Sequence, residues 1–259
     1  SVLGGSSGRR WGSFKFSFVW ASHGHGILGP NGGLKGLFAF PNFIRPGRMR
    51  RFSPPLHSAW PNEALSDPWA PNWAPWTLLG RPPGLFLAPD APTKCQLSPF
   101  GFQWFPIPSM DGTSETAAMI ELDRIASVTN QWIDNVILEE GVLDNNVFLF
   151  GFSQGTMLSL YMGPQRKNTM GGIIGFSGKV VNFDIFKNKV NTRPPVLLIH
   201  GDEDQVVSPS CLIEGHRELT SLKFDVKKFM AVGVGHGISE DGLSQASKFL
   251  LNHSSPVNF

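Results

Sequence analysis

Acidic residues are missing from the first 62 positions of the sequence. This stretch holds eight Lys or Arg residues, so the remainder of the 259-residue chain carries −6 once they are subtracted from the net charge of +2. The basic residues are scattered among Gly, Pro and aromatic residues, without the helical or groove-reading pattern of a nucleic-acid-binding arm. We therefore expect no nucleic-acid partner.

Cysteine is also scarce, and long apolar runs are absent. The two cysteines, Cys95 and Cys211, do not make a disulfide framework, which favours a reducing, cytoplasmic location. No run of about 20 apolar residues is present, so we expect no transmembrane segment. The pair Arg9 and Arg10 is not followed by a clean apolar segment with a small-residue cleavage site, so we expect no signal peptide.

The chain divides by composition into two parts, although its length suits one domain over residues 1–259. Residues 1–84 hold six of the eight tryptophans, and Pro and Gly interrupt almost every window. No helix can continue through that spacing, so this part is expected to be loop with one strand at residues 14–20. Residues 85–259 have the regular patterns of a folded catalytic part.

Short apolar runs alternate with helical patterns in the second part. The predicted strands are at residues 85–89, 147–150, 171–178, 196–199 and 224–230, and the predicted helices are at residues 114–140, 209–219 and 239–251. A loop is expected around residues 95–103 and a polar connection at residues 182–193. Strands and helices in this order predict an α/β fold with a mostly parallel central sheet and helices on both faces.

A strand, a sharp turn and a helix surround Ser153. The turn reads Gly151-Phe152-Ser153-Gln154-Gly155, which is the pattern of a nucleophile elbow. Glycines are needed two positions before and after the serine, because a side chain there would collide with the neighbouring strand or helix. Ser153 is therefore a candidate nucleophile, with the backbone N–H of Gln154 as a candidate oxyanion donor.

Acid and base candidates follow Ser153 in the order that an α/β-hydrolase requires. Asp202, Glu203 and Asp204 follow one apolar run, and His236 lies between glycines after another. The acid must reach over the sheet edge to the imidazole, and Asp204, just before Gln205-Val206-Val207, is the preferred candidate. Asp202 is expected to hydrogen-bond loop backbone, and His200 to be structural.

Two further sets of residues are candidates for the substrate site. His25 follows the expected first strand in a His-Gly-His-Gly sequence, where an oxyanion donor is expected; the alternative is a Gly-rich turn that happens to contain histidines. Leu97, Trp104, Phe105 and Ile107 are candidates for lining an acyl pocket. The simpler interpretation of the Trp-Phe pair is that it fills the core.

From residue 85 onward the sequence resembles the phospholipase/carboxylesterase family, which includes acyl-protein thioesterases. The matching segments are Ala88-Pro89-Asp90-Ala91-Pro92, Gln103-Trp104-Phe105, Gly151-Phe152-Ser153-Gln154-Gly155, Gly175-Phe176-Ser177-Gly178, His200-Gly201-Asp202-Glu203-Asp204-Gln205-Val206-Val207 and Gly235-His236-Gly237. Residues 27–84 do not share this resemblance. They are either a diverged cap or the product of a shifted reading frame.

The resemblance implies an α/β-hydrolase fold and a serine carboxylesterase that needs no metal or cofactor. Ser153 would be the nucleophile, Asp204 the acid and His236 the base, acting on short- to medium-chain esters, with acyl-thioesters and lysophospholipids as further substrate classes. It is also compatible with a homodimer. Two alternatives stay open: a catalytically impaired binding module on the same fold, and a peptidase, which is disfavoured because no added lid domain is recognisable.

Overall fold

The computed structural model describes residues 17–21, 51–52, 86–87, 89, 91–95 and 102–254, with the backbone alone at residues 17–21, 51, 52 and 86. These residues form a seven-stranded sheet in the order β2-β3-β1-β6-β7-β8-β9. All its described pairings are parallel except that of β2 with β3. The strands are β1 (Ser17–Ala21), β2 (Arg51–Phe52), β3 (Phe86–Leu87), β6 (Val147–Phe152), β7 (Gly172–Phe176), β8 (Val196–Gly201) and β9 (Val226–Ala231).

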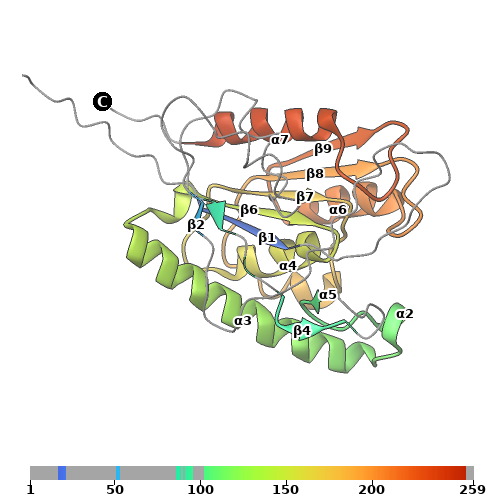
Figure 1. Cartoon of the computed structure of the whole chain (residues 1–259), viewed down its shortest axis with the longest axis horizontal. Helices are drawn as coiled ribbons and strands as arrows, with labels where there is room; N and C mark the ends of the chain where they lie inside the picture. The colour runs from blue at the N-terminus through green and yellow to red at the C-terminus, as the bar shows by residue number, and fades with distance from the viewer. Residues whose placement is uncertain are drawn as a thin grey trace, which may run out of the picture.

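Helices cover both faces of the sheet, with α7 on one face and α3 and α4 on the other (Figure 1). The described helices are α2 (Pro108–Asp111), α3 (Glu115–Glu140), η2 (Asp144–Asn146), α4 (Gln154–Met162), η3 (Gly163–Gln165), α5 (Phe183–Phe186), α6 (Ser210–Ser221) and α7 (Glu240–His253). This is the expected α/β-hydrolase architecture. None of the described helices is long and apolar enough to span a membrane.

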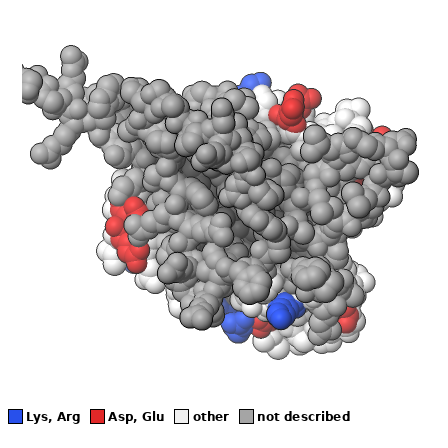
Figure 2. Space-filling view, viewed as in Figure 1, with Lys and Arg blue, Asp and Glu red and all other residues white. Residues whose placement is uncertain are grey.

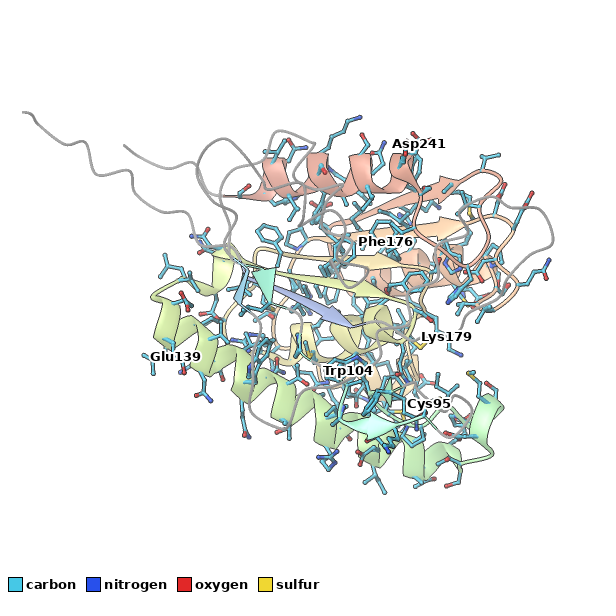
Figure 3. All side chains as sticks on the ribbon, in the orientation of Figure 1. Cys95, Trp104, Glu139, Phe176, Lys179 and Asp241 are labelled. Atoms are coloured by element: carbon cyan, nitrogen blue, oxygen red, sulfur yellow. The ribbon has the colours of Figure 1, made fainter. Side chains whose placement is uncertain are left out.

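The two larger hydrophobic clusters of the described residues follow from the alternation of side chains along the central strands. Leu149, Ile173 and Leu198 pack toward α3, α4 and α6, whereas Phe150 and Ile174 pack toward α7. Figure 3 shows Trp104 on the α3 side of the sheet and Phe176 between the sheet and α7. The central strands are therefore buried on both faces, as near-continuous apolar runs require.

The expected long helix is present with both of its predicted ends. Ser114 is the N-cap of α3, and its hydroxyl accepts a hydrogen bond from the Ala117 N–H. Gly141 ends the helix at a φ of 61°, a left-handed conformation that suits glycine. Ser239 caps α7 in the same manner as Ser114 caps α3, through the N–H of Gly242.

Several short elements were not expected from the sequence. β2 is a second strand in the part where one strand was predicted. β4 (Thr93–Lys94) and β5 (Phe102–Gln103) form a small antiparallel pair where a loop was predicted. Helix α5 interrupts the connection expected at residues 182–193. All of these elements are too short to show a period of two or 3.6 residues.

Charged side chains of both signs lie on the surface of the described residues. Figure 2 shows small groups of basic and of acidic side chains at the margin of this face. Arg166 is an exception because its side chain is only 5% exposed; it pairs with Asp134 and Asp144 at 2.6 and 3.0 Å. This pairing ties the end of η3 to α3 and η2.

Candidate active site

Ser153 lies at the junction of β6 and α4, in a backbone conformation that is rare for serine. Its φ is 53° and its ψ is −116°, and the residue as a whole is only 7% exposed. The Ser153 N–H donates to the carbonyl of Phe176 at 2.8 Å, which attaches the turn to β7. A strained residue held by its surroundings is typical of a functional position.

The glycines around the elbow are required by the close approach of α4 to the sheet. A Cβ atom at Gly151 would lie 2.3 Å from the backbone nitrogen of Thr156, and one at Gly175 would lie 2.4 Å from the Cγ2 of Thr156. A side chain at Gly151 would require the helix to move, and one at Gly175 would displace the Thr156 side chain. The first turn of α4 can therefore rest directly on β6 and β7, beside Ser153.

Asp204 follows β8 and is buried, with four hydrogen-bond donors around its carboxylate. The backbone N–H groups of Val206 and Val207 donate to Oδ1, each at 2.9 Å. His236 Nδ1 and His200 Nε2 lie 2.8 and 3.2 Å from Oδ2. Burial by itself would raise the pKa of Asp204, but these hydrogen bonds outweigh it and hold the pKa well below its ordinary value.

His236 lies beside the elbow and is oriented by Asp204. Its ring lies over that of Phe152, the residue before Ser153, with centroids 4.8 Å apart. An ionised carboxylate only accepts hydrogen bonds, so Nδ1 of His236 carries the proton and its Nε2 is left as an acceptor. Its side chain is 19% exposed, so the ring is accessible from solvent.

Backbone hydrogen bonds hold the loops of Asp204 and His236 together. The N–H groups of Asp202 and Glu203 donate to the carbonyls of Ala231 and Val234, each at 3.0 Å. The Asp202 carboxylate accepts from the N–H of Gly233 at 2.7 Å, which confirms its expected role in binding loop backbone. A Cβ at Gly201 would lie 2.1 Å from the Val234 carbonyl oxygen, so the two loops are in direct contact.

Gln154 has a role that the sequence did not indicate. Its side chain is fully buried; Oε1 accepts from the backbone N–H of Trp104 at 2.9 Å, and Nε2 donates to the backbone carbonyl of Phe105 at 2.7 Å. The amide therefore attaches the Trp104–Phe105 segment to the start of α4. Such a long-range contact leaves no periodic signal in the sequence.

The candidate pocket residues lie in different environments. Trp104 and Phe105 are buried in the core that includes α3 and α4, and Ile107 is half-buried before α2. Leu97 and the oxyanion candidate His25 lie outside the residues that the structure describes. Within the described part of the chain, no group of three His, Cys, Asp or Glu side chains is arranged to hold a metal ion.

Comparisons with known proteins agree with this arrangement. Residues 80–254 match the phospholipase/carboxylesterase family. The chain is 27% identical over 179 residues to acyl-protein thioesterase 1 of Gibberella zeae, covering 66% of this chain and 76% of that protein. It is 29% identical over 178 residues to acyl-protein thioesterase 1 homolog 1 of Dictyostelium discoideum, covering 64% of this chain and 75% of the relative.

A solved structure supports the same conclusion. The crystal structure of esterase PE8 superposes with a TM-score of 0.64 at 32% identity, covering 70% of this chain and 84% of the esterase. Fold and comparisons together define an α/β-hydrolase that acts on carboxylic esters. The chain belongs to the phospholipase/carboxylesterase family.

Proposed function

We propose that the protein is a serine carboxylesterase that acts on short- to medium-chain carboxylic esters through an acyl-enzyme on Ser153. Acyl-thioesters are related substrates of the proposed site, since two relatives are named acyl-protein thioesterases, and lysophospholipids are a third class, since the family includes phospholipases. The observation that carries the proposal is the 2.8 Å hydrogen bond between His236 Nδ1 and Asp204 Oδ2, beside a serine in a strained elbow.

The chemistry follows from the protonation states that this hydrogen bond requires. His236 Nε2 takes the proton of the Ser153 hydroxyl as the serine oxygen attacks the carbonyl carbon of the ester. The imidazolium that forms is stabilised by the ionised Asp204. It then protonates the leaving alkoxide or thiolate. Water activated by the same imidazole hydrolyses the acyl-enzyme and restores the Ser153 hydroxyl.

The negative charge that develops on the carbonyl oxygen needs a donor beside Ser153. Helix α4 begins at Gln154, and the positive end of its dipole lies at that residue. The backbone N–H of Gln154 is the proposed donor. The second donor in this proposal is the backbone N–H of His25.

Replacement of Ser153 tests the proposal directly. The Ser153→Ala variant is expected to lose at least about 10⁴-fold in kcat for p-nitrophenyl acetate and butyrate, because no nucleophile remains. The exposed Ser221 on α6 supplies the matched control, and Ser221→Ala should retain wild-type turnover. Unchanged hydrolysis by folded Ser153→Ala protein would refute the assignment of the nucleophile.

A fluorophosphonate probe separates an esterase from a non-catalytic binding module on the same fold. Only an activated serine reacts with such a probe, so we expect labelling of the wild type and of Ser221→Ala but not of Ser153→Ala. An unlabelled wild-type protein would favour the binding module. A series of p-nitrophenyl esters of increasing acyl length, with matching thioesters, then measures the preferred chain length from kcat/KM.

A further inference from the structure

His200 is a second imidazole in contact with Asp204, and the proposed mechanism does not use it. It is the penultimate residue of β8, its side chain is only 1% exposed, and its Nε2 lies 3.2 Å from Asp204 Oδ2. The same Nε2 lies 2.9 Å from the carbonyl oxygen of Val207. His200 therefore contacts both ends of the turn that carries Asp204.

The tautomer of His200 follows from these two partners. A carbonyl oxygen and an ionised carboxylate are both acceptors, so Nε2 must carry a hydrogen and share it between them. The N–H of His200 thus donates to the Val207 carbonyl and also lies 3.2 Å from Oδ2, the same oxygen that His236 uses. The two N–H groups of Val206 and Val207 occupy Oδ1, so the carboxylate cannot rotate without breaking hydrogen bonds on both sides.

We propose that His200 is a positioning residue, which fixes the Asp204 carboxylate toward His236 and limits how strongly that carboxylate stabilises the His236 imidazolium. This inference rests on the proposed function, since it concerns the same acid and base. Each donor on Oδ2 draws charge from the oxygen. Removing the His200 contact should therefore leave the Asp204 carboxylate more basic and strengthen its interaction with a protonated His236 ring.

Two other titratable side chains lie near His200. Lys179, which follows β7, and Cys211, on α6, line a small cavity beside His200. Burial, followed by the charge of Glu214, raises the pKa of the Cys211 thiol. These groups are unchanged in variants of His200, so a shift in titration between those variants reports on the His200–Asp204 contact.

The test compares His200→Met, which keeps the volume but has no donor, with His200→Gln, which keeps an N–H donor of similar reach. We expect His200→Met to lower kcat about tenfold with little change in KM, because Asp204 is no longer held in place. We also expect the acidic limb of its kcat/KM profile to move up by about 0.5–1 pH unit. His200→Gln should restore most of both properties.

An NMR titration keeps the inference distinct from the proposed function, because it does not need ester turnover. The His236 ring is titrated by NMR in the Ser153→Ala background, with and without His200→Met; a raised pKa supports the inference even if no ester is hydrolysed. His216→Met, on α6, is the control for loss of a histidine and should leave the titration unchanged. Where His200→Met does not fold, His200→Asn replaces it, since its shorter side chain does not reach Oδ2.

The outcomes separate the two ideas. Loss of turnover in Ser153→Ala, together with an unmoved pH limb and an unmoved His236 titration in His200→Met, would overturn the inference and leave the esterase intact. Equal effects of His200→Met and His200→Gln on kcat, with no shift of the limb, would also overturn it, because they indicate a packing role alone.

Discussion

At the scale of single residues, the ionisation of the Asp204 carboxylate is controlled by the hydrogen bonds around it. Its pKa is lowered, so its ionised form favours the folded state. That stabilisation is complete above the pKa of an unfolded aspartate, about 3.9, and is lost as the pH falls toward the lower pKa of the folded state. The pH dependence of stability should therefore reveal this carboxylate.

The variant Asp204→Asn is expected to lower the free energy of unfolding at pH 7 by about 2–4 kcal/mol. Its amide cannot accept hydrogen bonds on both sides from four donors. Because wild-type Asp204 loses its contribution in acid, the difference from wild type should shrink below about pH 4. Urea unfolding at pH 7, 5 and 3.5 measures it. Asp184→Asn, at a side chain 86% exposed, is the control. A difference that stays constant down to pH 3.5 would contradict the prediction.

The residues of the site differ in how far the sequence could predict them. Ser153, Asp204 and His236 lie in local patterns at strand ends, and each pattern is short enough to recognise. The donor role of His200 and the Gln154 bonds to residues 104 and 105 depend on distances across the folded chain. For His200, the available signal in the sequence was a histidine four positions before the acid, across a tight turn.

At the scale of helices and strands, end signals predicted the long elements well. Ser114, Gly141 and Ser239 set the ends of α3 and the start of α7 through hydrogen bonds and backbone conformations that their residue types favour. The pair β4 and β5 and helix α5 are too short for such signals. They form because of their contacts with the rest of the fold, which a local pattern does not contain.

Two glycines inside helices give a matched test of packing at this scale. A Cβ at Gly215 in α6 would meet Leu198 Cδ1 and Val180 Cγ2 at ordinary distances of 3.5 and 3.6 Å. A Cβ at Gly242 in α7 would lie 2.9 Å from Phe176 Cε1 and 3.1 Å from the capping hydroxyl of Ser239. The first site has space for a methyl group and the second does not.

Gly215→Ala should therefore raise the free energy of unfolding by about 0.5–1 kcal/mol, since alanine favours a helix over glycine. Gly242→Ala should lower it by about 1–3 kcal/mol through overpacking and disturbance of the N-cap. Urea denaturation of both variants measures the two changes. If both variants changed the free energy of unfolding in the same direction, the prediction would be wrong. Helix propensity alone or crowding alone would then explain both positions.

At the scale of the whole molecule, the central sheet joins the two parts that composition separates. Strand β1 lies between β3 and β6, and its five residues pair with residues 147–151 of the elbow strand. The match to the phospholipase/carboxylesterase family begins at residue 80 and so does not include β1. The sequence predicted a strand near these residues, but its place in the centre of the sheet depends on long-range pairing that a single sequence does not show.

A chain that begins at residue 80 should consequently fail to fold on its own. It would lack β1 and β2, leaving β6 with only β7 of its two parallel partners, next to the strained Ser153. An unpaired edge in the middle of a sheet exposes backbone donors and acceptors and favours aggregation. We expect this chain to show no cooperative urea unfolding transition by far-UV circular dichroism, and no labelling by the fluorophosphonate probe.

The control is a chain that ends at Ser254, just after α7, which keeps every described strand and should unfold cooperatively like the full chain. Addition of a peptide spanning residues 10–24 to the shortened chain tests the cause, because a supplied β1 can pair with β6. A chain from residue 80 that unfolds with the same midpoint as the full chain would show that residues 17–21 do not stabilise the elbow. Recovery of probe labelling with the peptide would instead show that the shortened chain fails because it lacks β1, and not because it lacks the other removed residues.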